Sequence, residues 1–185
     1  MSLAGKTPYE AYDNFRDSLQ KAISCVNREA HLWALSSNGY SPGQDHAIAP
    51  NRGELVKLSG EQDISLTAFF AYRVESIDGE HGPWRVRTTA YLHALEDDSS
   101  HQEIIAYHWH PKQGSAFNFP HLHIERGIGA DLGEIHKYHI PTGRVALEGI
   151  LRLAINEFGV KERRADWREV IDETQAEFER GRSWS

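Results

Sequence analysis

Two short histidine pairs stand close together in the second half of the chain. His108 and His110 form the first pair, His121 and His123 form the second, and residues 111–120 separate them. In a β-strand, residues i and i+2 lie on one face, so each pair directs two imidazoles to the same side. If His110 lies opposite His121, then His108 lies opposite His123 and all four rings meet. We therefore expect these four histidines to form a catalytic site.

Such a group of imidazoles suits two kinds of chemistry. Three imidazoles, or two with the carboxylate of Glu125, match the ligand set of zinc or another divalent transition metal that keeps one position open for water. Paired imidazoles can instead divide the base and acid roles in phosphodiester cleavage without any metal or other cofactor. The expected metal ligands are His108, His110, His121, His123 and Glu125. The sequence leaves the choice between the two chemistries open.

Neighbouring residues favour a phosphodiester such as RNA as the substrate. Phe117 and Phe119 can stack on bases, although a role as loop anchors packed on the core is the favoured interpretation. The residues expected to hold phosphate are Lys112, Arg126, Lys137 and Arg144. His136 and His139 either complete the site or face solvent.

Two functions of different kinds fit these residues. The leading hypothesis is a histidine-dependent hydrolase, in particular a phosphodiesterase or ribonuclease. The alternative is a non-catalytic interaction protein, in which the helices form a partner interface and the histidines form a structural metal site or a polar face. The sequence lacks the full Gly-x-x-x-x-Gly-Lys-Ser/Thr phosphate loop and a Cys-x-x-Cys motif, so those classes are set aside.

The elements that must position the histidines begin with a helix at the N-terminus. Thr7 is the expected N-cap, Pro8 takes the first helical position, and Glu10 is placed to close a capping box. Apolar residues then recur at spacings of three and four along about five helical turns. They are Tyr12, Phe15, Leu19, Ile23 and Val26. The glycines, prolines and Asn38 between residues 36 and 52 predict a loop.

Alternating polar and apolar residues predict a β-meander in the middle of the chain. The expected strands run over 63–75, 84–95, 103–110 and 121–126, and a short β-like piece follows at 135–140. Helical patterns return after residue 142, with Gly159 ending one helix and Asp166 capping the last. The prediction is a single α+β domain: N-terminal helix and loop over 1–52, an antiparallel sheet of four to five strands over 54–140, and C-terminal helices over 142–182.

Composition limits the partners. The net charge is −7, which argues against non-specific coating of nucleic acid. No apolar run is long enough for a membrane span, so we expect no membrane partner and a cytoplasmic location. Cys25 is the single cysteine, and its place on the apolar stripe of the N-terminal helix predicts a buried, inert thiol.

The middle of the chain resembles the TumE-type components of prokaryotic toxin–antitoxin modules. The similarity covers roughly residues 66–158: a β-meander runs into Pro120-His121-Leu122-His123, and a short segment and a helix follow. The resemblance implies a small toxin that acts on an intracellular target and pairs with an antitoxin, with His121 and His123 at the matching motif. This chain departs from the family pattern in its capped N-terminal helix, its segment up to residue 52 and its last helix. These additions are expected to serve oligomerisation, partner binding or a different role.

Overall fold

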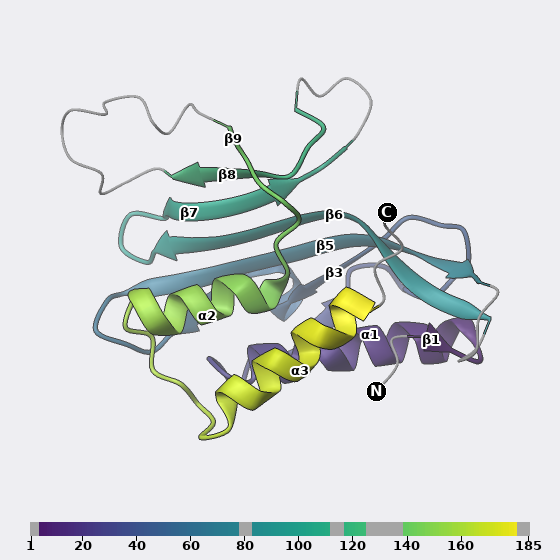
Figure 1. Cartoon of the computed structure of the whole chain (residues 1–185), viewed down its shortest axis with the longest axis horizontal. Coiled ribbons are helices and arrows are strands. Elements are labelled where there is room, and N and C mark those ends of the chain that lie inside the picture. Colours follow the sequence, from purple (N-terminus) through teal and green to yellow (C-terminus); the bar gives the residue numbers. More distant parts are fainter. Residues whose placement is uncertain (1–3, 78–82, 112–116, 125–138, 181–185) are drawn as a thin grey trace.

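A single antiparallel sheet forms the framework of the protein, and helices cover one of its faces (Figure 1). The structure, a computed structural model, describes residues 4–77, 83–111, 117–124 and 139–180. Within these ranges the sheet has nine strands, and three α-helices accompany it.

The predicted meander is present and forms the centre of the sheet. It consists of β5 (Ile64–Ser76), β6 (Trp84–Asp97), β7 (Gln102–Trp109) and β8 (His121–Ile124). Short strands extend it: β1 (Ala4–Gly5), β2 (Leu32–Ala34), β3 (His46–Pro50), β4 (Val56–Leu58) and β9 (Ile140–Pro141). The strand order across the sheet is β2-β3-β5-β6-β7-β8-β9, with β1 added on β6 and β4 added on β5. The helices are α1 (Pro8–Ile23), α2 (Leu147–Glu157) and α3 (Trp167–Arg180). Helices α1 and α2 contact the sheet, and α3 packs against both of them. The α+β class with a strand meander is therefore confirmed.

Helix α1 begins as its sequence predicts. Thr7 has an extended backbone, and its side-chain oxygen accepts a hydrogen bond from the Glu10 backbone N–H at 3.1 Å. The Glu10 carboxylate reaches back to the N–H of Lys6, at 2.7 Å. Helix α1 ends at Ile23, so Cys25 lies just beyond it and not within it. The thiol is fully buried, as expected, and burial raises its pKa to about 11.

The prediction of a loop over residues 36–52 is wrong for residues 46–50. Residues 46–50 form β3, which pairs with both β2 and the long strand β5. Its side chains explain the strand: Ile48 and Ala49 are buried, and His46 is buried with its Nε2 2.8 Å from the carbonyl oxygen of Ser41. The glycines and Pro42 of this segment precede the strand, and Pro50 is its last residue, so none of them interrupts it.

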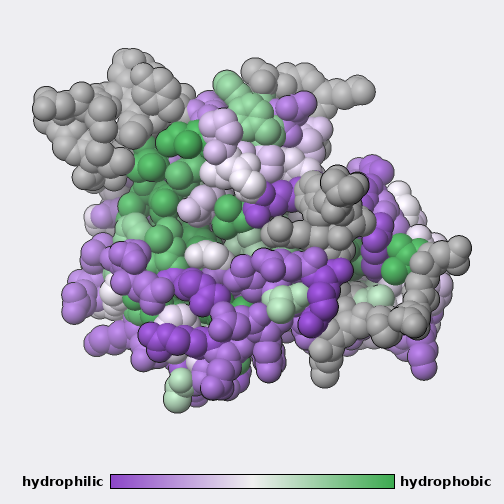
Figure 2. Space-filling model, in the orientation of Figure 1, coloured by the Kyte–Doolittle hydropathy of each residue, from purple (hydrophilic) through white to green (hydrophobic). Residues whose placement is uncertain are grey.

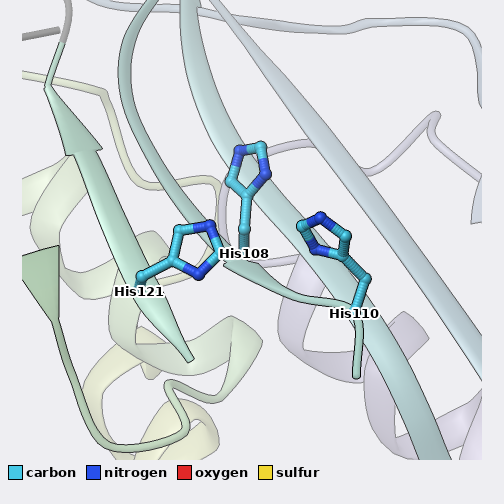
Figure 3. A group of neighbouring side chains, drawn as sticks. All are labelled: His108, His110 and His121. Atoms are coloured by element: carbon cyan, nitrogen blue, oxygen red, sulfur yellow. The ribbon is translucent and has the colours of Figure 1, made fainter. Parts of the chain in front are cut away.

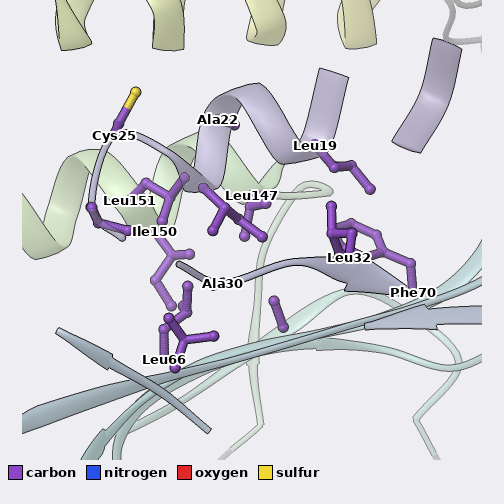
Figure 4. Close-up of a cluster of buried hydrophobic side chains, with 14 of the residues drawn as sticks. Leu19, Ala22, Cys25, Ala30, Leu32, Leu66, Phe70, Leu147, Ile150 and Leu151 are labelled. Atoms are coloured by element: carbon purple, nitrogen blue, oxygen red, sulfur yellow. The ribbon is translucent and has the colours of Figure 1, made fainter. Parts of the chain in front are cut away.

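The hydrophobic core lies between the helices and the sheet. Leu19 from α1, Ile150 from α2 and Leu66 from β5 meet there (Figure 4). Gly159 lies two residues beyond the end of α2. Its φ of 66° is the left-handed conformation expected of a glycine after a helix. Hydrophilic residues cover the visible outer surfaces of the helices, whereas hydrophobic surface is visible above them, over the strands (Figure 2). None of the helices in the described ranges has the length and apolar character that crossing a membrane requires.

Candidate metal centre

Alternation along β7 places its histidines on the sheet face away from the helices. Trp109 is buried in the core beneath the helices, so the preceding residue, His108, points to the other face. Tyr107 and Ile105 also pack against the core, on the face of β7 that alternates with His108. The sheet therefore separates the hydrophobic core from a polar group of histidines.

The pairing between the two histidine strands differs from the expected one by two residues. His108 lies opposite His121, and Ala106 lies opposite His123. The expected pairing of His110 with His121 is wrong, because β7 ends at Trp109 and His110 follows the strand. A shift of two residues keeps every side chain on its original face, so the predicted convergence of the four rings does occur.

Five imidazoles meet on this face, and we call them the histidine cluster: His108, His110, His121, His123 and His139. Ring centroids are 5.6 Å apart for His108 and His121, and 4.7 Å apart for His108 and His123. Figure 3 shows the rings of His110 and His121 on either side of His108. His139, directly before β9, lies 4.5 Å from His123 and 4.9 Å from His121. It thus joins the site, one of the two outcomes that the sequence left open.

His121 occupies the centre of the cluster, and the two nitrogens of its ring have different surroundings. It is only 1% exposed, and its Nδ1 lies 2.9 Å from the carbonyl oxygen of Phe119. Because a carbonyl only accepts hydrogen bonds, Nδ1 carries the proton and Nε2 keeps its lone pair. That Nε2 atom is buried and has no hydrogen-bond partner among the described residues. A histidine whose second nitrogen donates to a carbonyl is the usual arrangement of a metal ligand.

Burial keeps the inner imidazoles neutral. It lowers the pKa of His121, and the neighbouring histidines lower it further, against the opposing hydrogen bond to Phe119. Burial and the rings of His108, His139 and His121 together lower the pKa of His123 to about 4. Neutral imidazole is the form that binds metal ions. These two residues are therefore better suited to metal binding than to exchanging protons near neutral pH.

A carboxylate that sequence reasoning missed lies beside the cluster. Glu103 Oε1 is 3.8 Å from His108 Nε2, and the His108 imidazole holds the pKa of Glu103 below its ordinary value, against the opposing effect of burial. A bulge between Leu95 and Glu96 changes the pairing of β6 with β7 next to Glu103. The sequence carries no clear signal of this bulge, which is why Glu125 was expected in this role.

Two groups of three histidines bring their ligand atoms within 4.8 Å of one another. We call His108, His110 and His121 the outer triad, because His110 is exposed, and His121, His123 and His139 the inner triad. Tetrahedral ligands about 2.0–2.1 Å from zinc lie about 3.3 Å from one another. Side-chain rotations that move the rings inward by about an ångström would therefore bring either triad to bonding distance.

The residues expected to bind substrate are placed in different ways. The ring of Phe117 stacks on His139 at 3.8 Å, and Phe119 meets His121 edge-on at 5.9 Å, so both lie at the cluster. Arg144 instead lies 3.2 Å from the ring centre of Trp109, whose side chain is on the helix-covered face. Lys112, Glu125, Arg126, His136 and Lys137 lie outside the described residues.

Comparisons of the chain with protein-family models, with curated proteins and with solved structures found no match. The resemblance to the TumE-type toxin–antitoxin components therefore stays a prediction from the sequence.

Proposed function

We propose that the protein is a metal-dependent hydrolase and that the histidine cluster is its active site. The observation that carries this proposal is the buried Nε2 atom of His121, which has no described hydrogen-bond partner while its Nδ1 is fixed on the Phe119 carbonyl. A buried polar atom without a partner costs about 1–3 kcal/mol, and a bound metal ion would remove that cost. The neighbouring rings of both triads supply the other ligands.

The number of ligands favours a catalytic over a structural ion. Structural zinc sites are closed by four protein ligands, whereas catalytic sites use three and leave a position for water or substrate. Among the described residues, no four ligand atoms come within 4.8 Å of one another, and each group contains three. The bound ion would activate water and stabilise negative charge during hydrolysis. Exposed His110 gives this face an approach from solvent.

A phosphodiester, including RNA, is the substrate class that we propose. The metal ion would balance the phosphate charge. Phe117 lies at the cluster and is 36% exposed, so its ring can contact a base or another flat leaving group. A role as a toxin and an antitoxin partner stay predictions from the sequence.

Hydrolysis by purified protein tests the proposal. The apoprotein is prepared with a chelator and reloaded with zinc, manganese or cobalt, and product release is followed from RNA and from a synthetic bis-nitrophenyl phosphodiester. We expect metal-dependent turnover that falls at least about 100-fold in His121→Ala, which removes the ligand common to both triads. His31→Ala, which removes an exposed histidine outside the cluster, is the matched control and should retain full activity.

The proposal fails if neither substrate is hydrolysed with any of the three metals, or if His121→Ala retains the activity of His31→Ala. Turnover that resists the chelator and still needs His121 would assign the chemistry to the imidazoles alone. In that case the protein would still be a hydrolase, but its activity would not depend on a metal ion.

A further inference from the structure

The two triads share a single residue, His121. Its ring lies 5.7 Å from that of His110 in the outer triad and 4.9 Å from that of His139 in the inner triad. The remaining ligands do not overlap. The outer triad adds His108 of β7 and His110, which follows that strand, whereas the inner triad adds His123 of β8 and His139, which directly precedes β9. The occupancy of both triads therefore depends on what His121 can bind.

His121 can bind only one ion. An imidazole bridges two metals only when both nitrogens are deprotonated, and here Nδ1 carries the proton that it donates to the Phe119 carbonyl. Turning the ring to free Nδ1 would leave that carbonyl without its donor beside a residue that is 1% exposed. A single lone pair, on Nε2, therefore serves both triads, and an ion in one triad removes the shared ligand from the other.

The two triads also differ in their access to solvent. His110 is exposed, so an ion from solution can reach the outer triad directly. His139 and His123 are half-buried, and the ring of Phe117 stacks on His139 at an angle of 9°. An ion that passes from the outer to the inner triad can exchange His108 and His110 for His123 and His139 while it stays bound to His121.

We propose that the cluster holds one divalent transition-metal ion per chain, which occupies either of two alternative positions that share His121. The outer triad is the position of entry, and the inner triad is the more enclosed position. This inference rests on the proposed metal site and adds its stoichiometry and the route by which the ion enters. It predicts that the chain still binds one ion when a single ligand other than His121 is removed, because the triad that does not contain that ligand stays complete.

Calorimetric titration of the full chain with zinc chloride tests the inference, with His31→Ala as the matched control. We expect one ion per chain for the wild type, for His31→Ala, for His110→Ala and for His139→Ala. If the two positions are equally populated, each of the last two variants raises the dissociation constant only about twofold, because half of the binding population is lost. The double variant His110→Ala/His139→Ala leaves two imidazoles in each position and should weaken binding at least about tenfold.

The outcomes separate this inference from the proposed hydrolase. Two ions per chain in the wild type would overturn the shared ligand, and loss of binding in either single variant would overturn the alternative positions. Both results leave a metal-dependent hydrolase intact. Absence of zinc binding to the wild type would overturn the inference and would also remove the metal from the proposed function. Far-ultraviolet circular dichroism establishes that the variants are folded, and the wild-type stoichiometry decides the shared ligand even if the double variant does not fold.

Discussion

Replacing His93 with Gln tests the aromatic layer that lies behind the histidine cluster. His93 lies on β6, on the helix-covered face, and is 1% exposed. Its ring stacks on Tyr91 with the centroids 4.7 Å apart and lies 4.8 Å from the ring of Phe70. Burial lowers the pKa of His93 to about 3. The hydrogen bond between its ring and the Leu92 carbonyl acts in the opposite direction but has the smaller effect.

This pKa makes the folded state sensitive to acid. The unfolded chain takes up a proton at this position below a pH of about 6.5, whereas the folded chain does so only near pH 3. Because the unfolded state binds more protons between these values, the stability present above pH 6.5 is lost as the pH falls. Between pH 6.5 and pH 4.5 the loss from His93 alone is about 2 kcal/mol.

Urea unfolding at the two pH values measures this loss. Carboxylates and the other histidines titrate in both proteins, so the wild type minus His93→Gln isolates the contribution of His93. We expect the free energy of unfolding of the variant to fall by about 2 kcal/mol less than that of the wild type over this range. Equal pH dependence in the two proteins would refute the reasoning and show that His93 is protonated, or accessible, in the folded state.

Three further predictions follow from single contacts. Tyr72→Phe removes the hydroxyl that donates to the buried Gly39 carbonyl at 2.7 Å, so it should lower the free energy of unfolding by about 1–3 kcal/mol in urea, and an unchanged value would contradict the contact. Thr7→Ala should cost about 1 kcal/mol by the same assay, whereas Thr7→Ser retains the oxygen that caps α1 and should cost far less; equal losses would exclude the cap. Cys25, with its pKa of about 11 and its full burial, should react with an aromatic disulfide at pH 8 only after denaturation, and rapid labelling of the native protein would contradict its placement.

Local signals in the sequence predict the parts of the fold that depend on neighbouring residues. The N-cap at Thr7 and the glycine at 159 mark helix boundaries through backbone geometry that only a few residue types favour. The alternation around Trp109 and His108 assigns the two faces of β7, because a strand has a period of two whatever it pairs with. The convergence of the histidines follows from this alternation and withstands the shift in pairing.

Features that depend on distant residues could not be predicted in the same way. Strand β3 exists because Ile48 faces the core and pairs with β5, a contact across more than twenty residues that the surrounding prolines and glycines conceal. Glu103 approaches His108 next to a bulge, and a bulge changes the pairing without a defined residue type. The carbonyl that fixes the His121 ring belongs to the backbone of Phe119. Every residue has such a carbonyl, so no residue type in the sequence predicts this contact.

X-ray absorption spectroscopy of the zinc-loaded protein tests the metal centre most directly. The spectrum reports the elements and distances in the first coordination sphere of the ion. We predict three imidazole nitrogens at about 2.0–2.1 Å with at least one further oxygen from water, because each triad contributes three rings. A first sphere of oxygen atoms alone, or one that contains sulfur from Cys25, would contradict a metal centre built from the histidine cluster.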